Sequence, residues 1–510
     1  MPSIVAIRSS SWVSRWAFSS IRGTSGSSMQ NDVPAADRGP GLRAGLIVIA
    51  AVTLGRVLAL WFNRTDLFVD EAQYWLWGQA PDFGYYSKPP MIAWVIGAVT
   101  SLFRSDAAFF VRLPAPLFHA ATAAVLARIA ATWIGPRAGF WAAVGWITLP
   151  VVAVGSLLVS TDTIMFPFLA AALGVWMAAA SRQSAGLAAL AGGLLGLAAL
   201  SKYIALLYVA GAALAALSAT WRPRPRVWLA ALVALGLVIL PNVLWNLANG
   251  FATVEHTLDN ADWVRETRPL NPAGVLAFLV AQAGVLGPVM AVAFVGGVLT
   301  ARGPAERLWV AFSVPIILIM TVEALLSRAY ANWAVAAYAA GTLLATGWLL
   351  RRGRGWRLAT VIVNGIVSVA LPAATIFPHA IRTPDGRLFL HRYLGRAELS
   401  RSILAASDVL GADTIVTDSR DVAADLFHTG RDSGKRFFVP PPVGRPRNHY
   451  EQRHAVHGPL GGTVLYVGTS GPPACAPGTS PALVLSPPEG AYAGGHFGLY
   501  LVPGNCWSDQ

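Results

Sequence analysis

The sequence predicts a polytopic α-helical membrane protein with a small mixed domain at its carboxy-terminal end. Of the 510 residues, 55% are hydrophobic and only 12% are charged, whereas soluble proteins contain about a quarter charged residues. The mean hydropathy of +0.54 agrees with a membrane protein. Long apolar runs recur until about residue 377, after which the chain is mixed polar and apolar and rich in Gly and Pro.

Apolar runs that are long enough to cross a bilayer predict eleven membrane-spanning helices. They lie near residues 42–62, 111–133, 138–158, 163–181, 185–200, 203–220, 227–247, 273–300, 306–327, 332–350 and 356–377. A further run at 90–104 is apolar but short. We therefore expect an interfacial helix there, on the outer face, inside a long first loop of about residues 63–110.

Three arginine-rich loops set the predicted orientation. They span residues 222–226, 302–307 and 351–357. Because positively charged loops stay on the cytoplasmic side, counting outward from them places the amino terminus in the cytoplasm. The same count places the first loop, the loop 248–272 and everything after about residue 378 on the outer face. In a bacterial inner membrane this outer face is the periplasmic side.

The same positive-inside bias explains the net charge of +13. The basic residues cluster in short loops between apolar runs, and no basic groove or RNA-binding signature appears. We therefore predict membrane lipids as partners and no nucleic acid.

The predicted domains follow from these changes in composition. Residues 1–40 are polar, Ser-rich and Arg-bearing, and are expected to be a transit-like or disordered leader; the alternative is that the true start is Met29. Residues 41–380 form the transmembrane domain, and residues 381–510 form a small α/β or α+β domain on the outer face.

Inside the carboxy-terminal domain, residues 412–416 and 462–467 are predicted strands and residues 422–428 a helix. Its two cysteines, Cys475 and Cys506, leave two alternatives open. They form one disulfide in an oxidising compartment, or they are two free thiols.

The most unusual segment is in the first outer loop and reads DLFVDEAQYWLWGQAPDFGYYSKPP from Asp66 onward. Two adjacent carboxylates, Asp70 and Glu71, are costly near a bilayer unless they are used or paired. The aromatic residues around them are typical of the membrane–water boundary. Together with Lys88, they suit chemistry on a lipid-borne substrate that carries phosphate.

Other polar residues are predicted on the same face. The full set is Asp70, Glu71, Lys88, Asp162, Lys202, Tyr203, Glu255, His256, Asp259, Asp262, Arg265, Arg328, Tyr330 and Asn332. A carboxylate in such a set can remove a proton from an acceptor hydroxyl or amine. The cations can neutralise the charge on a departing phosphate. One base and one leaving-group clamp would give inversion at the sugar carbon.

Several of these residues also allow plainer interpretations. Asp70 and Asp162 could cap helices, and Lys88 could extend its side chain to the interface. Lys202 and Arg328 could be ordinary loop cations.

Motifs along the chain match a known family. They are Asp70-Glu71, the segment Gly84-Tyr85-Tyr86-Ser87-Lys88-Pro89-Pro90, Arg112-Leu113, Asp162, and Arg328 with Asn332-Trp333. Together they resemble the bacterial branch of the protein-mannosyltransferase superfamily, which consists of GT-C glycosyltransferases. This branch includes the aminoarabinose transferase of lipid A and galacturonosyltransferases of the lipopolysaccharide core. The resemblance covers roughly residues 45–380.

The resemblance implies a GT-C fold, a polyprenyl-phosphate-linked sugar as donor, and a lipid, lipopolysaccharide or protein acceptor at the periplasmic face. The predicted catalytic residues are Asp70, Glu71 and Asp162, the donor-phosphate cations are Lys88, Lys202 and Arg328, and the pocket residues are Tyr85, Tyr86, His256, Tyr330 and Asn332. The carboxy-terminal domain does not resemble the additional domains of other members.

Metal dependence stays open at this point. Ser87 occupies the position before Lys88 at which the aminoarabinose transferase has a carboxylate implicated with metal. His256 has no partner at recognisable ligand spacing, so we expect it to form structural hydrogen bonds. No metal ligands are assigned, and a divalent metal is left open as a cofactor.

The alternative function is a transporter or flippase of lipid-linked sugars. A transporter is expected to place ionisable residues near the middle of the membrane and to show repeated halves. Here these residues fall at the ends of the predicted spans, and no halves repeat. The sequence therefore favours an enzyme.

Overall fold

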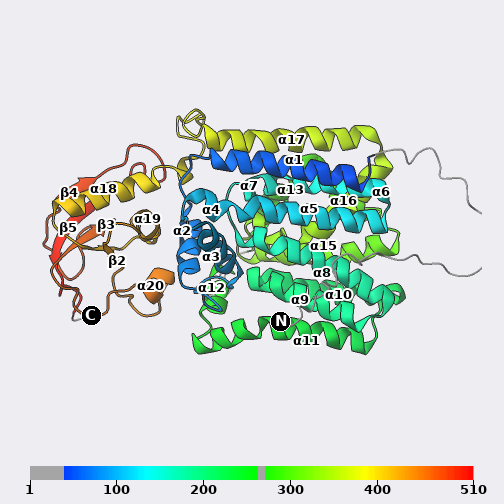
Figure 1. Ribbon diagram of the computed structural model, residues 1–510, viewed down its shortest axis with the longest axis horizontal. Coiled ribbons are helices and arrows are strands. Elements are labelled where there is room, and N and C mark those ends of the chain that lie inside the picture. The colour runs from blue at the N-terminus through cyan, green and yellow to red at the C-terminus, as the bar shows by residue number, and fades with distance from the viewer. Residues whose placement is uncertain (1–39, 262–269, 509–510) are drawn as a thin grey trace, which may run out of the picture. The chain divides into compact units, whose positions relative to one another are not determined.

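The computed structural model describes residues 40–261 and 270–508. The predicted leader at 1–40 lies outside the described residues, apart from residue 40. Pro40–Gln510 form a compact unit, in which a bundle of helices is followed by a domain that contains a β-sheet (Figure 1).

Long apolar helices make up the bundle. Among the described residues, six are long and apolar enough to cross a membrane, or up to seven if a bent pair counts as one span. The six are α1 (Leu42–Trp61), α4 (Ala108–Arg112) continued by α5 (Pro114–Trp133), α8 (Thr161–Arg182), α11 (Pro225–Ala248), α15 (Pro304–Leu326) and α17 (Arg354–Ile376). The polytopic helical class is confirmed, and the count of eleven spans stays a prediction.

Two predicted spans are interrupted. The run 273–300 forms α13 (Pro272–Leu286) and α14 (Pro288–Leu299), which meet at an angle of 108°. At the break, Gly287 has φ +81° and approaches Asn364 so closely that an added Cβ would lie 1.9 Å from its Oδ1. Proline follows at 288, where it cannot donate the backbone hydrogen bond of a continuous helix.

The run 138–158 is similarly divided into α6 (Pro136–Ile147) and α7 (Pro150–Gly155). Shorter elements complete the bundle. They are α9 (Ala185–Ser201), η2 (Tyr203–Leu206), α10 (Leu207–Ala215), η3 (Ala219–Trp221), α12 (Ala252–Ala261), η4 (Ala331–Ala334) and α16 (Ala337–Arg352).

The first loop contains α2 (Val69–Gln79) and α3 (Met91–Phe103). In Figure 1 both helices lie at one end of the long helices α1, α5 and α8, next to the sheet domain. The apolar helix α3 has 13 residues, fewer than the roughly 20 that span a bilayer. The expected short helix at 90–104 is therefore present.

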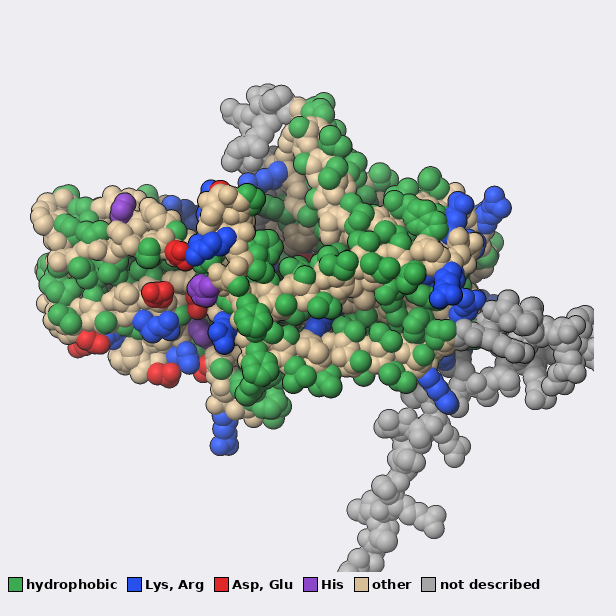
Figure 2. All heavy atoms as spheres, turned by 90° about the horizontal axis from the view of Figure 1, so that it is seen from above, with side chains coloured by type: hydrophobic (Ala, Val, Ile, Leu, Met, Phe, Trp, Pro, Cys, Tyr) green, Lys and Arg blue, Asp and Glu red, His purple; other side chains and the backbone are tan. Residues whose placement is uncertain are grey.

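Hydrophobic side chains remain exposed along the outside of the bundle. On α1, Ile47 is 69% exposed, and on α17 Val369 is 72% exposed. In Figure 2, Lys and Arg lie toward both ends of this face, and Asp and Glu are seen among them toward the sheet domain but not at the opposite end. Between the two ends, the helical middle shows a band of hydrophobic side chains. Such a band is what a bilayer requires, because lipid tails cannot hydrate polar groups.

The carboxy-terminal domain is a mixed five-stranded sheet in the order β2-β1-β3-β5-β4. Its elements are η5 (His391–Tyr393), α18 (Arg396–Val409), β1 (Thr414–Thr417), α19 (Arg420–Thr429), β2 (Arg436–Phe438), α20 (His449–Arg453), β3 (Thr463–Gly468), β4 (Leu483–Leu485) and β5 (Phe497–Pro503). The predicted strands at 412–416 and 462–467 correspond to β1 and β3, and the predicted helix to α19. All three predictions are confirmed.

The topology defines one functional edge of this sheet. Strand β1 pairs in parallel with β2 on one side and with β3 on the other. The chain therefore leaves β1 toward β2 and later crosses to the opposite side of β1. In α/β sheets, ligands bind at the carboxyl ends of strands at such a switch point.

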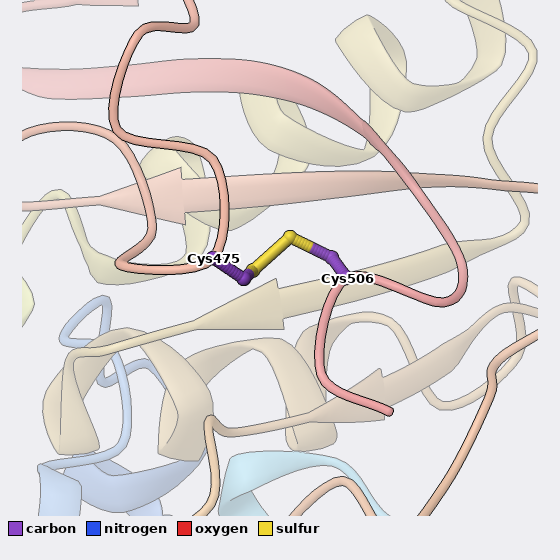
Figure 3. The surroundings of a disulfide bond; sticks show 2 residues. All are labelled: Cys475 and Cys506. Carbon is purple, nitrogen blue, oxygen red and sulfur yellow. A yellow bond between two sulfur atoms is a disulfide. The ribbon is translucent and has the colours of Figure 1, made fainter. Parts of the chain in front are cut away.

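Cys475 and Cys506 form a disulfide, so the alternative of two free thiols is not the one observed (Figure 3). Their Cα atoms are 5.4 Å apart and the residues are separated by 31 positions. The bond links the segment after β3 to the end of the domain.

The first loop of the bundle contacts the domain directly. The carboxylate of Asp66 accepts a hydrogen bond of 2.9 Å from the backbone amide of Arg396. His428 Nε2 lies 3.0 Å from the carbonyl oxygen of Asp106. These contacts hold the start of α18 and the end of α19 against the first loop. Trp75 of α2 also packs edge-on against His428 of α19, with ring centroids 4.8 Å apart, so α19 and the residues at the carboxyl end of β1 lie beside α2.

Candidate active site

Asp70 and Glu71 lie in the first turn of α2, where negative charge is stabilised by the helix dipole. Glu71 Oε2 accepts a hydrogen bond of 3.0 Å from the backbone amide of Phe68, the N-cap residue of this helix. The predicted alternative in which Asp70 is the N-cap is therefore wrong.

Glu71 is buried in a saturated hydrogen-bond network. Its two carboxylate oxygens accept hydrogen bonds of 2.9 Å and 2.7 Å from the guanidinium of Arg112, which makes a bidentate ion pair. It also accepts a hydrogen bond of 2.9 Å from the backbone amide of Val159. Both Glu71 and Arg112 are only 1% exposed. The pair connects α2 to α4 and to the start of α8, so the geometry gives Glu71 a structural role instead of the catalytic one predicted.

Asp70 has the opposite environment. Its side chain is 47% exposed, and its Oδ1 accepts a hydrogen bond of 2.7 Å from Arg420 of the carboxy-terminal domain. Among the described residues, nothing donates a hydrogen bond to Oδ2 of Asp70. This oxygen is therefore available to receive a proton.

Asp162 lies in the first turn of α8, which begins after the N-cap Ser160. Its two oxygens are occupied, Oδ1 by Lys202 at 2.7 Å and Oδ2 by Asn332 at 3.2 Å. Asp162 is 7% exposed. The structure thus brings Asp162, Lys202 and Asn332 together, and Asp162 is engaged in an ion pair.

A large cavity begins beside this ion pair. It has a volume of about 620 Å³ and is lined by Lys88 and Lys202 together with a long apolar wall from η2, α12 and α15. Apolar residues dominate that wall, which includes Ile204, Leu207, Leu258, Leu318, Ile319, Met320, Val322 and Leu326. A cavity with two lysines near one end and a mostly apolar wall fits a lipid phosphate.

Lys88 is the unpaired cation of this cavity within residues 40–261 and 270–508. Burial lowers its pKa, the positive charge of Lys202 lowers it further, and the negative charges of Asp70 and Asp162 oppose the change. Both carboxylates are therefore within electrostatic reach of one amine. Tyr74 is also close enough to both carboxylates to be affected by them, because burial and then the negative charges of Asp70 and Asp162 raise its pKa.

Two predicted pocket residues serve the loop instead. Tyr85 stacks on Trp77 with ring centroids 4.6 Å apart, and its hydroxyl donates a hydrogen bond of 3.0 Å to the backbone carbonyl of Trp77. The hydroxyl of Tyr86 donates 2.8 Å to the carbonyl of Pro446 in the carboxy-terminal domain. Both tyrosines are buried and neither lines the cavity of Lys88, so their assignment to the substrate pocket stays a prediction.

Arg328 and Tyr330 lie apart from the cavity. The guanidinium of Arg328 is positioned over the Tyr330 ring at 5.2 Å, and Tyr330 is 48% exposed. Neither residue lines the cavity that contains Lys88. In this structure the cation near Asp162 is Lys202, and Arg328 does not join it.

His256 is on α12, with its ring 5.2 Å from that of Tyr86. Burial lowers its pKa to about 4, and the positive charges of Lys88 and Arg420 add to this effect. His256 is therefore neutral at ordinary pH. It borders the site without lining the cavity.

The remaining acidic residues of this loop are engaged elsewhere. Glu255 and Asp259 both pair with Arg445 of the carboxy-terminal domain. Asp262 and Arg265 lie outside the described residues.

Comparisons with known proteins agree with this geometry. A family described as dolichyl-phosphate-mannose-protein mannosyltransferase matches residues 87–245. The lipid A galacturonosyltransferase RgtD of Rhizobium johnstonii is 44% identical over 472 residues, which cover 91% of this chain and 99% of the relative. The chain belongs to the GT-C glycosyltransferases.

Solved structures of this family share the fold. The crystal structure of ArnT from Cupriavidus metallidurans in the apo state has a TM-score of 0.63 at 15% identity and covers 91% of this chain and 99% of ArnT. The same ArnT bound to undecaprenyl phosphate has a TM-score of 0.65 at 14% identity, with the same coverage. The likeness to ArnT shows the fold, and the 44% identity to the glycosyltransferase RgtD shows that this GT-C chain is an enzyme, so the flippase alternative is set aside.

The candidate metal ligands of this GT-C site are its His and carboxylate side chains. Within residues 40–261 and 270–508, no three His, Cys, Asp or Glu side chains gather as ligands. Asp162 and Asp70 are each paired with a cation instead. Among the described residues, these two carboxylates of the site are thus engaged by Lys202 and Arg420, respectively.

Sequence reasoning missed two residues of this glycosyltransferase site. Arg420 follows a predicted strand by four residues and begins an amphipathic helix, a pattern that by itself indicates only a surface residue. Glu323 is 5% exposed in α15 and lines the cavity. A carboxylate in an apolar span was the available signal, because such residues are costly in a membrane.

Proposed function

We propose that this glycosyltransferase moves a galacturonosyl group from a polyprenyl-phosphate donor to lipid A at the periplasmic face. The identity to RgtD supports the sugar and the acceptor, because RgtD is named for both. The ArnT complex supports a prenyl phosphate as the lipid carrier. The cavity of this chain carries the proposal, since its apolar wall and its lysines match the two ends of such a donor.

The proposed roles follow from the environments of the charged groups. The prenyl chain lies along the apolar wall, and its phosphate binds Lys88, which has no protein partner among the described residues. Lys202 is held beside the phosphate by Asp162. The lysine charges stabilise the negative charge that builds up on the phosphate as the sugar leaves.

Asp70 is the proposed base because it has an available oxygen and is partly exposed. Its Oδ2 takes the proton of an acceptor hydroxyl as the acceptor oxygen bonds to the anomeric carbon of the sugar. The bond from that carbon to the phosphate oxygen breaks, and its electron pair stays on the phosphate. One displacement inverts the anomeric centre.

The proposed location is a bacterial inner membrane with the amino terminus in the cytoplasm. Figure 2 supports this orientation, because the end of the bundle away from the sheet domain shows Lys and Arg on this face with no Asp or Glu among them. The disulfide between Cys475 and Cys506 also supports a periplasmic domain, since such bonds persist in oxidising compartments. The domain limits at about 41–380 and 381–510 are proposed on the same grounds.

Purified full-length protein in proteoliposomes tests the proposal. It is supplied with polyprenyl-phosphate-linked galacturonic acid and lipid A, and the product is examined by mass spectrometry and NMR. We expect lipid A that carries one added hexuronic acid with an inverted anomeric centre. Absence of this product, with a different sugar or acceptor accepted instead, would overturn the assignment of substrates.

A further inference from the structure

The carboxy-terminal domain places a cation beside the proposed catalytic base. Arg420 Nη2 donates two hydrogen bonds, one of 2.7 Å to Asp70 Oδ1 and one of 3.1 Å to Gln73 Oε1. Arg420 Nε donates a third hydrogen bond, of 3.3 Å, to the same oxygen of Gln73. Lys88 and His256 are also within electrostatic reach of Arg420. A residue outside the membrane bundle is thus part of the site.

The fold of the domain accounts for this placement. Arg420 begins α19 directly after β1, and its neighbour Ser419 caps that helix by accepting from the amide of Val422. Asp418 accepts from the backbone amide and hydroxyl of Thr469, the residue that follows β3. The loop is therefore fixed across the carboxyl ends of β1 and β3, the switch point at which α/β sheets bind ligands.

One edge of the Arg420 guanidinium remains open. Among the described residues, Nη1 has no hydrogen-bond partner, and the side chain is 37% exposed. Two arginines that form buried ion pairs, Arg112 and Arg396, are far less exposed than Arg420, with side chains that are only 2% and 5% exposed. Arg420 thus combines a fixed position beside Asp70 with a donor group that is free among the described residues.

We propose that Arg420 recognises the carboxylate of the transferred sugar and so selects a uronosyl donor over a neutral hexosyl donor. This inference rests on the proposed function. A planar guanidinium matches a planar carboxylate and forms charge-assisted hydrogen bonds with it. With the donor phosphate at Lys88, the sugar lies between Lys88 and Asp70, and its carboxylate reaches Nη1 of Arg420. The carboxy-terminal domain therefore contributes donor specificity.

Two other roles predict different behaviour. If Arg420 only positions Asp70, its loss affects charged and neutral donors equally. If Arg420 binds a phosphate of the acceptor, its loss removes the preference for phosphorylated over dephosphorylated lipid A. In each of the three roles Arg420 binds an anion, but the anion is the sugar carboxylate, Asp70 or a phosphate of the acceptor. Loss of Arg420 therefore changes the donor preference, neither preference, or the acceptor preference, respectively.

The experiment uses the full-length protein and its Arg420→Gln and Arg420→Lys variants. Arg431→Gln is the matched control, because Arg431 is in the same domain and contacts Asp106 at 4.0 Å instead of Asp70. Polyprenyl-phosphate galacturonic acid and polyprenyl-phosphate galactose are titrated separately, and binding is followed by the ligand-induced rise in Tm. This measurement needs no turnover, so inactive variants remain informative.

We expect Arg420→Gln to reduce the preference for the uronosyl donor by about tenfold or more, as for loss of a charged hydrogen bond. Arg420→Lys should recover part of that preference, and Arg431→Gln should leave it unchanged. An equal loss for both donors would overturn the proposal, as would a loss confined to the preference for phosphorylated acceptor. If the wild type itself prefers the neutral donor, the proposed function fails first.

Discussion

Asp70 and Glu71 are adjacent at the start of α2, yet their side chains lie in opposite environments. The Asp70 side chain is 47% exposed and has one free oxygen among the described residues, whereas Glu71 is 1% exposed and fully hydrogen-bonded. Successive residues of a helix point about 100° apart, so the two carboxylates separate into one available group and one structural group.

Asp70→Asn should abolish transfer while the protein remains folded. The change keeps the size of the side chain but removes the base, and general base catalysis contributes about 10²-fold to 10⁴-fold. Turnover is measured in proteoliposomes, and folding by thermal unfolding in detergent. Asp106→Asn is the control, because its amide oxygen can still accept from Trp75. Wild-type turnover by folded Asp70→Asn protein would exclude Asp70 as the base.

Glu71→Gln should reduce stability before it reduces chemistry. Removing one charge of a buried ion pair costs about 3–5 kcal/mol, because the Arg112 charge is left without its partner. We expect a clear fall in Tm in detergent. Asp70→Asn, which breaks a partly exposed pair, should change stability by no more than about 1 kcal/mol. A Glu71→Gln protein with normal Tm and no turnover would return Glu71 to the catalytic residues.

Lys88→Met should weaken donor binding by about tenfold or more, the cost of one charged hydrogen bond. Lys88→Arg should retain most of the affinity, since the charge is kept. Binding of undecaprenyl phosphate is measured by the ligand-induced rise in Tm. Lys435→Met in the carboxy-terminal domain is the control, because Lys435 pairs with Asp408 outside the site. Unchanged affinity in Lys88→Met would place the phosphate elsewhere.

Donor binding should also depend on pH through Lys88. Burial and Lys202 lower the pKa of Lys88, and only the protonated amine attracts phosphate. Affinity should therefore be full at pH values below this lowered pKa and decline as the pH rises through it. Lys88→Arg should keep its affinity to higher pH, because arginine stays charged. Identical pH profiles for the two proteins would show that Lys88 does not titrate in the binding step.

The orientation can be measured with single cysteines. Val443 of the carboxy-terminal domain is fully exposed, and Arg354 begins α17 in a predicted cytoplasmic loop. Val443→Cys should react with an impermeant thiol reagent in intact spheroplasts, whereas Arg354→Cys should react only after lysis. The native cysteines are silent because they form a disulfide. The reverse pattern would show that the membrane orientation is inverted.

Much of the architecture could be predicted because hydropathy is a local property of the chain. The six long helices and the short helix α3 coincide with apolar runs, and β1 and β3 coincide with short apolar segments between turns. The meeting of Lys88, Lys202 and Asp162 was also expected. Charges at span ends on the same face gain by converging, since isolated charges near lipid are costly.

The roles of individual residues within the site could not be predicted from the hydropathy and motifs of the sequence. Tyr85 and Tyr86 read as pocket residues, but their rings and hydroxyls pack the loop and the domain interface. Whether an aromatic side chain lines a cavity depends on what packs against it. Arg328 and Lys202 are both cations at span ends, and only the packing of α9 against α8 brings Lys202 to Asp162.

The linear sequence was sufficient for a helical membrane enzyme with an acidic pair and a lysine in its first outer loop, because composition and short motifs act through nearby residues. Three-dimensional packing alone distinguished the available Asp70 from the buried Glu71. It also brought Arg420 to Asp70 across 350 positions of the chain. Burial and pairing of charges are set by distant segments, and these properties determine which charged groups can meet a substrate.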